Sequence, residues 1–155
     1  MKILAVLQNQ WFHDPEKIKA IIERTPKARR KIITYSLFAG CRTGRVLKQV
    51  FGDDCSRRFV WEEASREIGG HASSAFPADL EHLRAALAEV KPDIVLGFGK
   101  IACDALAGLV DGHDLVIGPH PTARGADTLP RLRIMADCVA NMVKHRSQYV
   151  GERDK

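Results

Sequence analysis

The chain has 155 residues, of which 45% are hydrophobic and 28% charged, and its formal net charge is +5. These values are typical of a globular protein with one core of ordinary size, and we expect a single domain over residues 1–155. No stretch approaches the roughly 20 apolar residues of a membrane-spanning helix, so we expect no such span. The segment Met1–Trp11 lacks the small residues of a signal-peptide cleavage site, so we expect a cytoplasmic protein.

The positive charge is concentrated in three stretches: Arg24–Lys31, Cys41–Arg45 and Ser56–Arg58. Such stretches are compatible with a polyanionic partner, because lysine and arginine release counterions when they bind phosphates. A solvated surface explains them equally well, so charge alone does not decide between the two.

The four cysteines are widely spaced and form no C-x-x-C pair: Cys41, Cys55, Cys103 and Cys138. This spacing suggests neither a zinc site nor an iron–sulfur cluster. We expect free thiols.

The first part of the chain predicts strand, helix, strand, helix. Lys2–Leu7 is an apolar run of strand length, and Asp14 followed by Pro15 is typical of a helix start. Lys31–Tyr35 is rich in β-branched residues and predicts a second strand. Thr43–Gly52 predicts a helix that glycine ends.

The second part continues the alternation. Three further strands are expected at Arg58–Glu62, Lys91–Gly99 and Asp114–Gly118. Helices are expected at Asp79–Val90, where leucines 80, 83 and 87 and Val90 share a face, and at Lys100–Leu109 and Leu132–Arg146. Ile68–Pro77 has the composition of a loop.

This order predicts a three-layer α/β/α fold around a short, mostly parallel sheet. In such folds ligands bind beyond the carboxyl ends of the strands. Three segments are therefore expected at one edge of the sheet: Gln8–His13, Gly97–Lys100 after the fourth strand and Gly118–Gly125 after the fifth.

Gly97, Gly99 and Ala102 form a G-x-G-x-x-A pattern between a strand and a helix, as in dinucleotide-binding sites. That fingerprint requires an acidic residue at the end of the next strand, whereas Asp114 stands at its start. We favour the alternative that the glycines let the helix pack close to its strand, and a nucleotide-cofactor enzyme is kept as a third hypothesis.

Two of the edge segments, Ile3–His13 and Leu115–Gly125, resemble the active-site motifs of the uracil-DNA glycosylase superfamily. The matching residues are Gln8-Asn9 and His120-Pro121-Thr122. Between them, Leu37–Gly52 looks like the family's aromatic residue followed by Gly-Arg-x-Leu, and Asp93–Leu106 like its strand, glycine and helix. The chain departs from the family pattern in three ways. Gln10 and Trp11 replace the usual proline turn, and Thr122 replaces serine. The chain is also shorter than most members of the family.

The resemblance implies a hydrolase that cleaves the N-glycosidic bond of uracil or a related damaged or modified base in DNA, without metal or cofactor. Asn9 would orient a water molecule beneath the sugar, and His120 would donate to the departing base as a neutral imidazole. This pair is similar to that of the single-strand-selective monofunctional and mismatch-specific branches. We expect a monomer.

By the same resemblance Phe38 would stack on the flipped base, and Glu62, four residues before Arg66, would read its edge. An ionised carboxylate only accepts hydrogen bonds, so we hypothesise a base other than plain uracil; a one-residue shift would bring in Glu63 with the same objection. The other expected contacts are Gln8, Gln10, Trp11 and Thr122 to the substrate and Arg45, Lys100 and Arg124 to DNA phosphates.

The unusual Gln10-Trp11 turn and the glutamate at the edge-reading position leave a second reading open. A relative that has lost hydrolysis would bind DNA or a nucleotide as a recognition or base-modification module.

Overall fold

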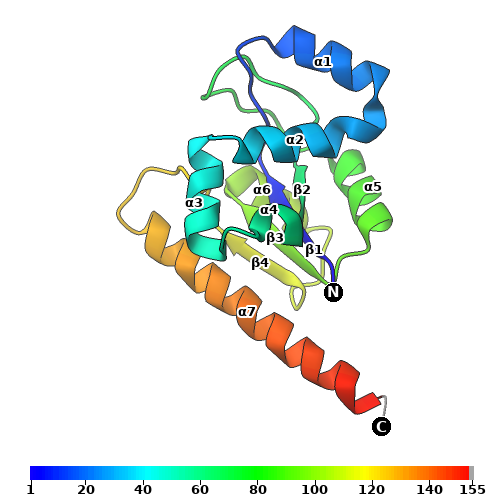
Figure 1. Cartoon of the computed structure of the whole chain (residues 1–155), viewed down its shortest axis with the longest axis vertical. Helices are drawn as coiled ribbons and strands as arrows, with labels where there is room; N and C mark the ends of the chain where they lie inside the picture. Colours follow the sequence, from blue (N-terminus) through cyan, green and yellow to red (C-terminus); the bar gives the residue numbers. More distant parts are fainter. Residues whose placement is uncertain (154–155) are drawn as a thin grey trace.

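The computed structural model describes the backbone of residues 1–153 and the side chains of residues 1–148. Its centre is a parallel sheet of four strands in the order β2-β1-β3-β4 (Figure 1). The strands are β1 (Ile3–Leu7), β2 (Phe59–Glu63), β3 (Ile94–Phe98) and β4 (Leu115–Gly118). Because they are parallel, their carboxyl ends all lie at the same edge of the sheet.

Helices cover both faces of this sheet. They are α1 (Pro15–Arg24), the 3₁₀ helix η1 (Pro26–Ala28), α2 (Arg29–Phe38), α3 (Arg42–Phe51), α4 (Cys55–Arg58), α5 (Leu80–Val90), α6 (Lys100–Ala107) and α7 (Thr128–Arg153). Residues of α2, α3, α4 and α7 form the core on one face and those of α5 and α6 the core on the other. The predicted three-layer α/β/α architecture is confirmed.

Strand β1 shows how the two cores are divided. Its five residues are all buried, and successive side chains of a strand point to opposite faces. Ile3 and Leu7 lie in the core beneath α3 and α7, whereas Leu4 and Val6 lie in the core beneath α5 and α6. A central parallel strand covered on both faces is therefore apolar throughout, as its sequence is.

The predicted helix starts are confirmed at α1 and α5. The carboxylate of Asp14 accepts from the backbone N–H of Lys17 at 3.1 Å, and that of Asp79 accepts from His82 at 3.0 Å. Each satisfies one of the free N–H groups of a helix amino terminus. The end of α3 at Gly52 is also confirmed, where φ is 93°.

The predicted strand at Lys31–Tyr35 is wrong, because this segment lies within α2. Ile33 and Leu37 are four residues apart and both buried, so a helix places them on one face against the core. This tertiary burial overrides the strand preference of β-branched residues. The sheet consequently has four strands, so Gly97–Lys100 lies at the end of the third strand and Gly118–Gly125 at the end of the fourth.

Smaller corrections concern element bounds. The strand expected over Arg58–Glu62 begins one residue later, at Phe59, and ends at Glu63, because Arg58 closes α4. Leu80 is 44% exposed and contributes nothing to the core, in contrast to Leu83. No helix among the described residues is long and apolar enough to cross a membrane.

Candidate functional site

The expected segments do meet at one edge of the sheet. Gln8–His13 leaves β1, Gly99 follows β3, and Pro119 and His120 follow β4. Strand β3 pairs with both β1 and β4, so two inter-strand spacings, about 10 Å, separate the ends of β1 and β4. Gly99 lies between the two segments.

His120 is held in one orientation by Thr122. The backbone N–H of Thr122 donates to Nδ1 of His120 at 3.3 Å, and the Thr122 hydroxyl lies 3.0 Å from the same atom. A backbone N–H can only donate, so Nδ1 is the acceptor and the proton of the neutral ring is on Nε2. Burial also lowers the pKa of His120, which favours that neutral form. Thr122, expected at the substrate, contacts the histidine in the structure.

Gly99 makes room for this histidine. Its φ is 84°, and a Cβ placed there would lie 3.2 Å from Cβ of His120. At Gly97 a Cβ would lie 3.1 Å from Cδ1 of Leu106 and 3.5 Å from Cα of Cys103, both in α6. The two glycines thus serve the close approach of α6 and of His120 to β3, which accounts for the pattern without a dinucleotide.

Asn9 offers a hydrogen-bond acceptor. Its Nδ2 donates to the carbonyl of Gln10 at 3.1 Å, whereas its buried Oδ1 has no partner among the described residues. Leaving a buried acceptor unpaired costs about 1–3 kcal/mol, so this oxygen is available to accept from a water molecule or a ligand. Asn9 therefore presents an acceptor at the edge where His120 presents a donor.

The turn that carries Asn9 is fixed by backbone hydrogen bonds to the segment after β2. The N–H of Ser65 donates to the carbonyl of Gln8 at 3.1 Å, that of Gly69 to Gln10 at 2.9 Å, and that of Phe12 to Gly69 at 2.8 Å. These bonds hold the turn although it lacks a proline.

Trp11 stands on this fixed backbone with 39% of its surface exposed. Its ring meets that of His13 edge to face, with the centroids 5.3 Å apart. The side chain is thus at the surface of the site, where the sequence placed it among the substrate contacts.

Glu62 does not fit the edge-reading role expected for it. Although only 1% exposed, its carboxylate contacts Arg29 Nη1 at 2.7 Å, Arg30 Nε at 2.9 Å and His82 Nε2 at 3.0 Å. Burial alone would raise the pKa of Glu62, but the hydrogen bond from His82 and the charge of Arg29 outweigh it and lower the pKa to about 2. This carboxylate joins β2 to α2 and α5 and has no capacity to spare for a base.

Glu63, which the sequence offers as the alternative one residue after Glu62, has a different environment. It ends β2 opposite Leu7, is 1% exposed, and its Oε2 accepts from the backbone N–H of Gln10 at 2.9 Å. Burial raises the pKa of Glu63 to about 8, although the charge of Arg29 and the hydrogen bond from Gln10 act in the opposite direction. Strand alternation could have shown that Glu62 and Glu63 differ, because two adjacent residues of a strand point to opposite faces of the sheet.

Phe38 lies on the Glu63 face of the sheet. It ends α2 and meets Trp61 edge to face with centroids 5.2 Å apart, and Trp61 and Glu63 are two residues apart on β2. Lys48 Nζ lies 5.8 Å from the centre of the Phe38 ring. The expected stacking residue and the neutral glutamate thus share one face, whereas Glu62 points to the other.

Gly44 sets the position of Phe38. A Cβ at Gly44 would lie 1.9 Å from the carbonyl oxygen of Leu37, so α3 can only pack against the end of α2 because this residue is glycine. The Gly-Arg pattern after the aromatic residue therefore has a packing role.

The three cations expected at phosphates are all exposed. Arg45 Nη1 donates to the carbonyl of Gly40 at 2.6 Å, and Lys100 Nζ lies 2.6 Å from Asp104 Oδ2. Arg124 stands in the loop after His120. The structure brings none of them into contact with Asn9 or His120.

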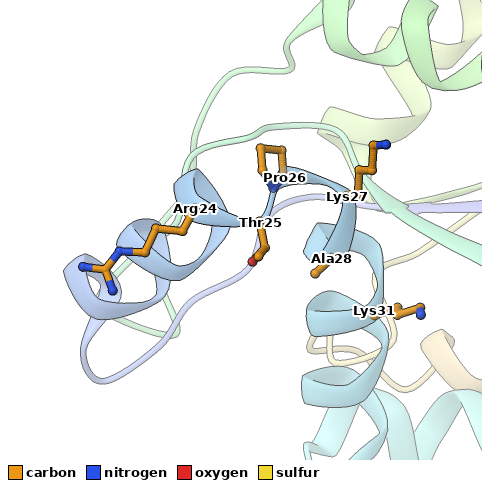
Figure 2. A pocket seen from close by; sticks show the side chains of 6 residues that line it. All are labelled: Arg24, Thr25, Pro26, Lys27, Ala28 and Lys31. Atoms are coloured by element: carbon orange, nitrogen blue, oxygen red, sulfur yellow. The ribbon is translucent and has the colours of Figure 1, made fainter.

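A surface hollow of about 550 Å³ lies at the corner between α1 and α2, and none of its lining residues belongs to the segments that follow β1, β3 or β4. It is lined by Arg24, Thr25, Pro26, Lys27, Ala28 and Lys31 (Figure 2). Figure 2 shows the side chain of Arg24 pointing to one side of the turn and those of Lys27 and Lys31 to the other. The cations do not converge on one point, so the hollow lacks the geometry of an anion site.

Among the described residues no three His, Cys, Asp or Glu side chains come together as metal ligands, and the four cysteines are free thiols. Comparison of the chain with protein-family models, with curated proteins and with solved structures finds no match. The function therefore has to be argued from the site itself.

Proposed function

We propose that this protein is a DNA glycosylase that hydrolyses the bond between a damaged or modified base and deoxyribose. The observation that carries the proposal is the neutral His120, whose Nδ1 is occupied by Thr122 and whose Nε2 is left to donate. A leaving base gathers negative charge on its carbonyl oxygen, and a fixed donor stabilises that charge most in the transition state.

Asn9 supplies the second half of the reaction. Its unpaired Oδ1 accepts from a water molecule and orients the water oxygen towards C1′. The C1′–N bond breaks as the C1′–O bond forms; the base leaves with the bonding electrons, and one water proton finally goes to it. An amide removes no proton, so the reaction relies on departure of the base more than on activation of water.

The test is a base-release assay on single- and double-stranded oligonucleotides that carry uracil, hypoxanthine, xanthine or an oxidised pyrimidine, followed by alkaline cleavage of abasic sites. We expect His120→Ala to reduce release by about 10²–10³-fold and Asn9→Asp to increase it. His113→Ala is the matched control, because His113 is exposed and precedes β4 at the opposite edge. No release from any substrate, with DNA affinity retained, would sink the proposal.

A DNA-binding module that does not hydrolyse is the second candidate, and exposed Trp11 favours it. An aromatic ring of this size on a fixed backbone is suited to stacking with an unpaired base. Binding of abasic or single-stranded DNA without base release would select this candidate.

A further inference from the structure

The two edge strands of the sheet, β2 and β4, differ in how far they are covered. At β2, Phe59 and Trp61 are only 3% and 1% exposed, and Arg30 of α2 donates to Glu89 of α5, in the opposite layer, at 3.0 Å. At β4, helix α7 packs on one face of the strand, and Ile117 remains 55% exposed. An uncovered apolar edge is a surface on which another strand can pair.

The backbone of β4 leaves two residues unpaired on its outer side. The carbonyls of Asp114 and Gly118 accept hydrogen bonds of 2.8 and 2.9 Å from the backbone of β3 and of the residue after it. Successive residues of a strand direct their N–H and C=O groups to alternate sides, so Leu115 and Ile117 face away from the sheet. Their backbone groups have no partner among the described residues. Pro119, the next residue on that side, has no N–H, so the free edge ends there.

The two ends of this edge carry opposite charge. Asp111 lies in the loop before β4 and Arg124 in the loop after it, and both are exposed, with no ion-pair partner among the described residues. The other ion pairs beside the strand add no net charge: Asp114 with Arg146, and Asp127 with Arg131. The edge is therefore negative at its amino end, apolar along the strand and positive at its carboxyl end.

We propose that β4 pairs antiparallel with β4 of a second copy of this chain, across a two-fold axis at Val116, so that the two sheets become one. In this register Leu115 of each copy lies opposite Ile117 of the other, and the two residues exchange both of their backbone hydrogen bonds. Every free group of the edge then has a partner. The same pairing packs the exposed isoleucine against a leucine on the α6 face of the sheet.

Two features favour a second copy over the strand of another protein. The free groups are symmetric about Val116, and a two-fold interface between identical chains has to be self-complementary in this way. Antiparallel pairing also brings the loop of Asp111 in one copy towards the loop of Arg124 in the other. The paired stretch is short, so we expect a dissociation constant in the micromolar range. The chain expected to be a monomer is then a dimer at high concentration, whatever reaction it catalyses.

Sedimentation velocity of the unaltered protein between about 1 and 300 µM tests the proposal, and the average mass should rise from that of one chain towards that of two. Ile117→Lys places a charge where Leu115 of the other copy packs, so it should raise the dissociation constant at least about tenfold. The fold should be kept, because the Ile117 side chain is at the surface. Ile21→Lys, at a partly exposed isoleucine of α1, is the matched control.

Charge reversal tests the antiparallel arrangement. Asp111→Arg and Arg124→Asp should each weaken the dimer by about threefold to tenfold at low salt, because like charges then meet at both ends of the paired strands. The variant that carries both changes restores opposite charges and should recover the affinity. A double variant as weak as the single ones would overturn the antiparallel register.

Amide hydrogen exchange observes the paired backbone directly and needs no substitution. The amides of Leu115 and Ile117 should exchange rapidly at low protein concentration and slowly at high concentration, whereas that of Val116, bonded to β3, should be slow at both. A mass that stays at one chain up to about 300 µM, or an equal loss of affinity in Ile117→Lys and Ile21→Lys, would overturn the proposal. A dimer in which the amides of Leu115 and Ile117 still exchange rapidly would show that the copies meet elsewhere.

Discussion

Glu62 and Glu63 are neighbours in the chain, equally buried, and opposite in state. Glu62 faces α5 and is held by Arg29, Arg30 and His82, which keeps it ionised. Glu63 faces the other layer, has a backbone N–H for a partner, and is held neutral. Burial is the same for both, so the difference comes from what each face of the sheet places opposite the carboxyl group.

This difference divides the end of β2 into a structural side and a chemical side. An ion pair that satisfies every atom fixes α2 and α5 to the strand and leaves nothing to bind a ligand. The neutral Glu63 accepts from the backbone N–H of Gln10, the residue after Asn9, whose buried amide oxygen has no partner among the described residues. The two sides can be separated by substitution.

The largest effect is expected from Glu62→Gln. Removing one partner leaves Arg29 and Arg30 partly buried without their counter-charge, which costs about 3–5 kcal/mol of unfolding free energy. Urea unfolding followed by circular dichroism measures it. Glu89→Gln is the control, since Glu89 is 71% exposed and its pair with Arg30 is worth less than about 1 kcal/mol. Equal losses in the two variants would show that burial of Glu62 contributes nothing.

Glu63→Gln should stabilise the protein at alkaline pH, whereas Glu62→Gln should destabilise it. The folded state raises the pKa of Glu63 from 4.5 to about 8, so its stabilising contribution is complete below pH 4.5 and is lost as the pH rises through 8. The amide does not titrate, so relative to the unaltered protein the variant should gain about 4 kcal/mol of stability between pH 4 and pH 8. Melting temperatures from pH 4 to 9 measure this. Parallel curves for the two proteins would contradict a neutral Glu63.

Gly44→Ala tests the chemical side without touching the ion pairs. The added methyl overlaps the carbonyl of Leu37, so the end of α2 with Phe38 must move, at a cost of about 1–3 kcal/mol. Base release should fall more than unfolding accounts for. Gly112→Ala, at a glycine with open space around it, is the control. Unchanged release in the folded variant would show that Phe38 does not stack on the base.

The smallest effect on stability, under about 0.5 kcal/mol, is expected for Trp11→Phe, because the side chain is largely at the surface. The chain has two tryptophans, and Trp61 is 1% exposed. Quenching of fluorescence by single-stranded DNA should therefore come from Trp11 and disappear in the variant. Quenching that survives would place the nucleic acid elsewhere.

The sequence by itself determined the architecture and the edge that carries the candidate site. Apolar runs with turn residues behind them predicted β1, β3 and β4, and Asp14 and Asp79 predicted two helix starts. Since parallel strands end at one edge, the sequence also brought Asn9 and His120 to that edge. These inferences depend on local chemistry and on chain order, which a sequence contains.

Tertiary structure decided what lies on either side of β2. Lys31–Tyr35 became part of a helix because Ile33 and Leu37 are buried together, and the helices that cover the face of each glutamate depended on how the layers pack. The charge of Glu62 follows from side chains that come from about 20 to 33 residues away, and the neutrality of Glu63 follows from its burial between packed layers. Protonation is set by solvation and neighbouring charge, and both exist only once the layers are packed.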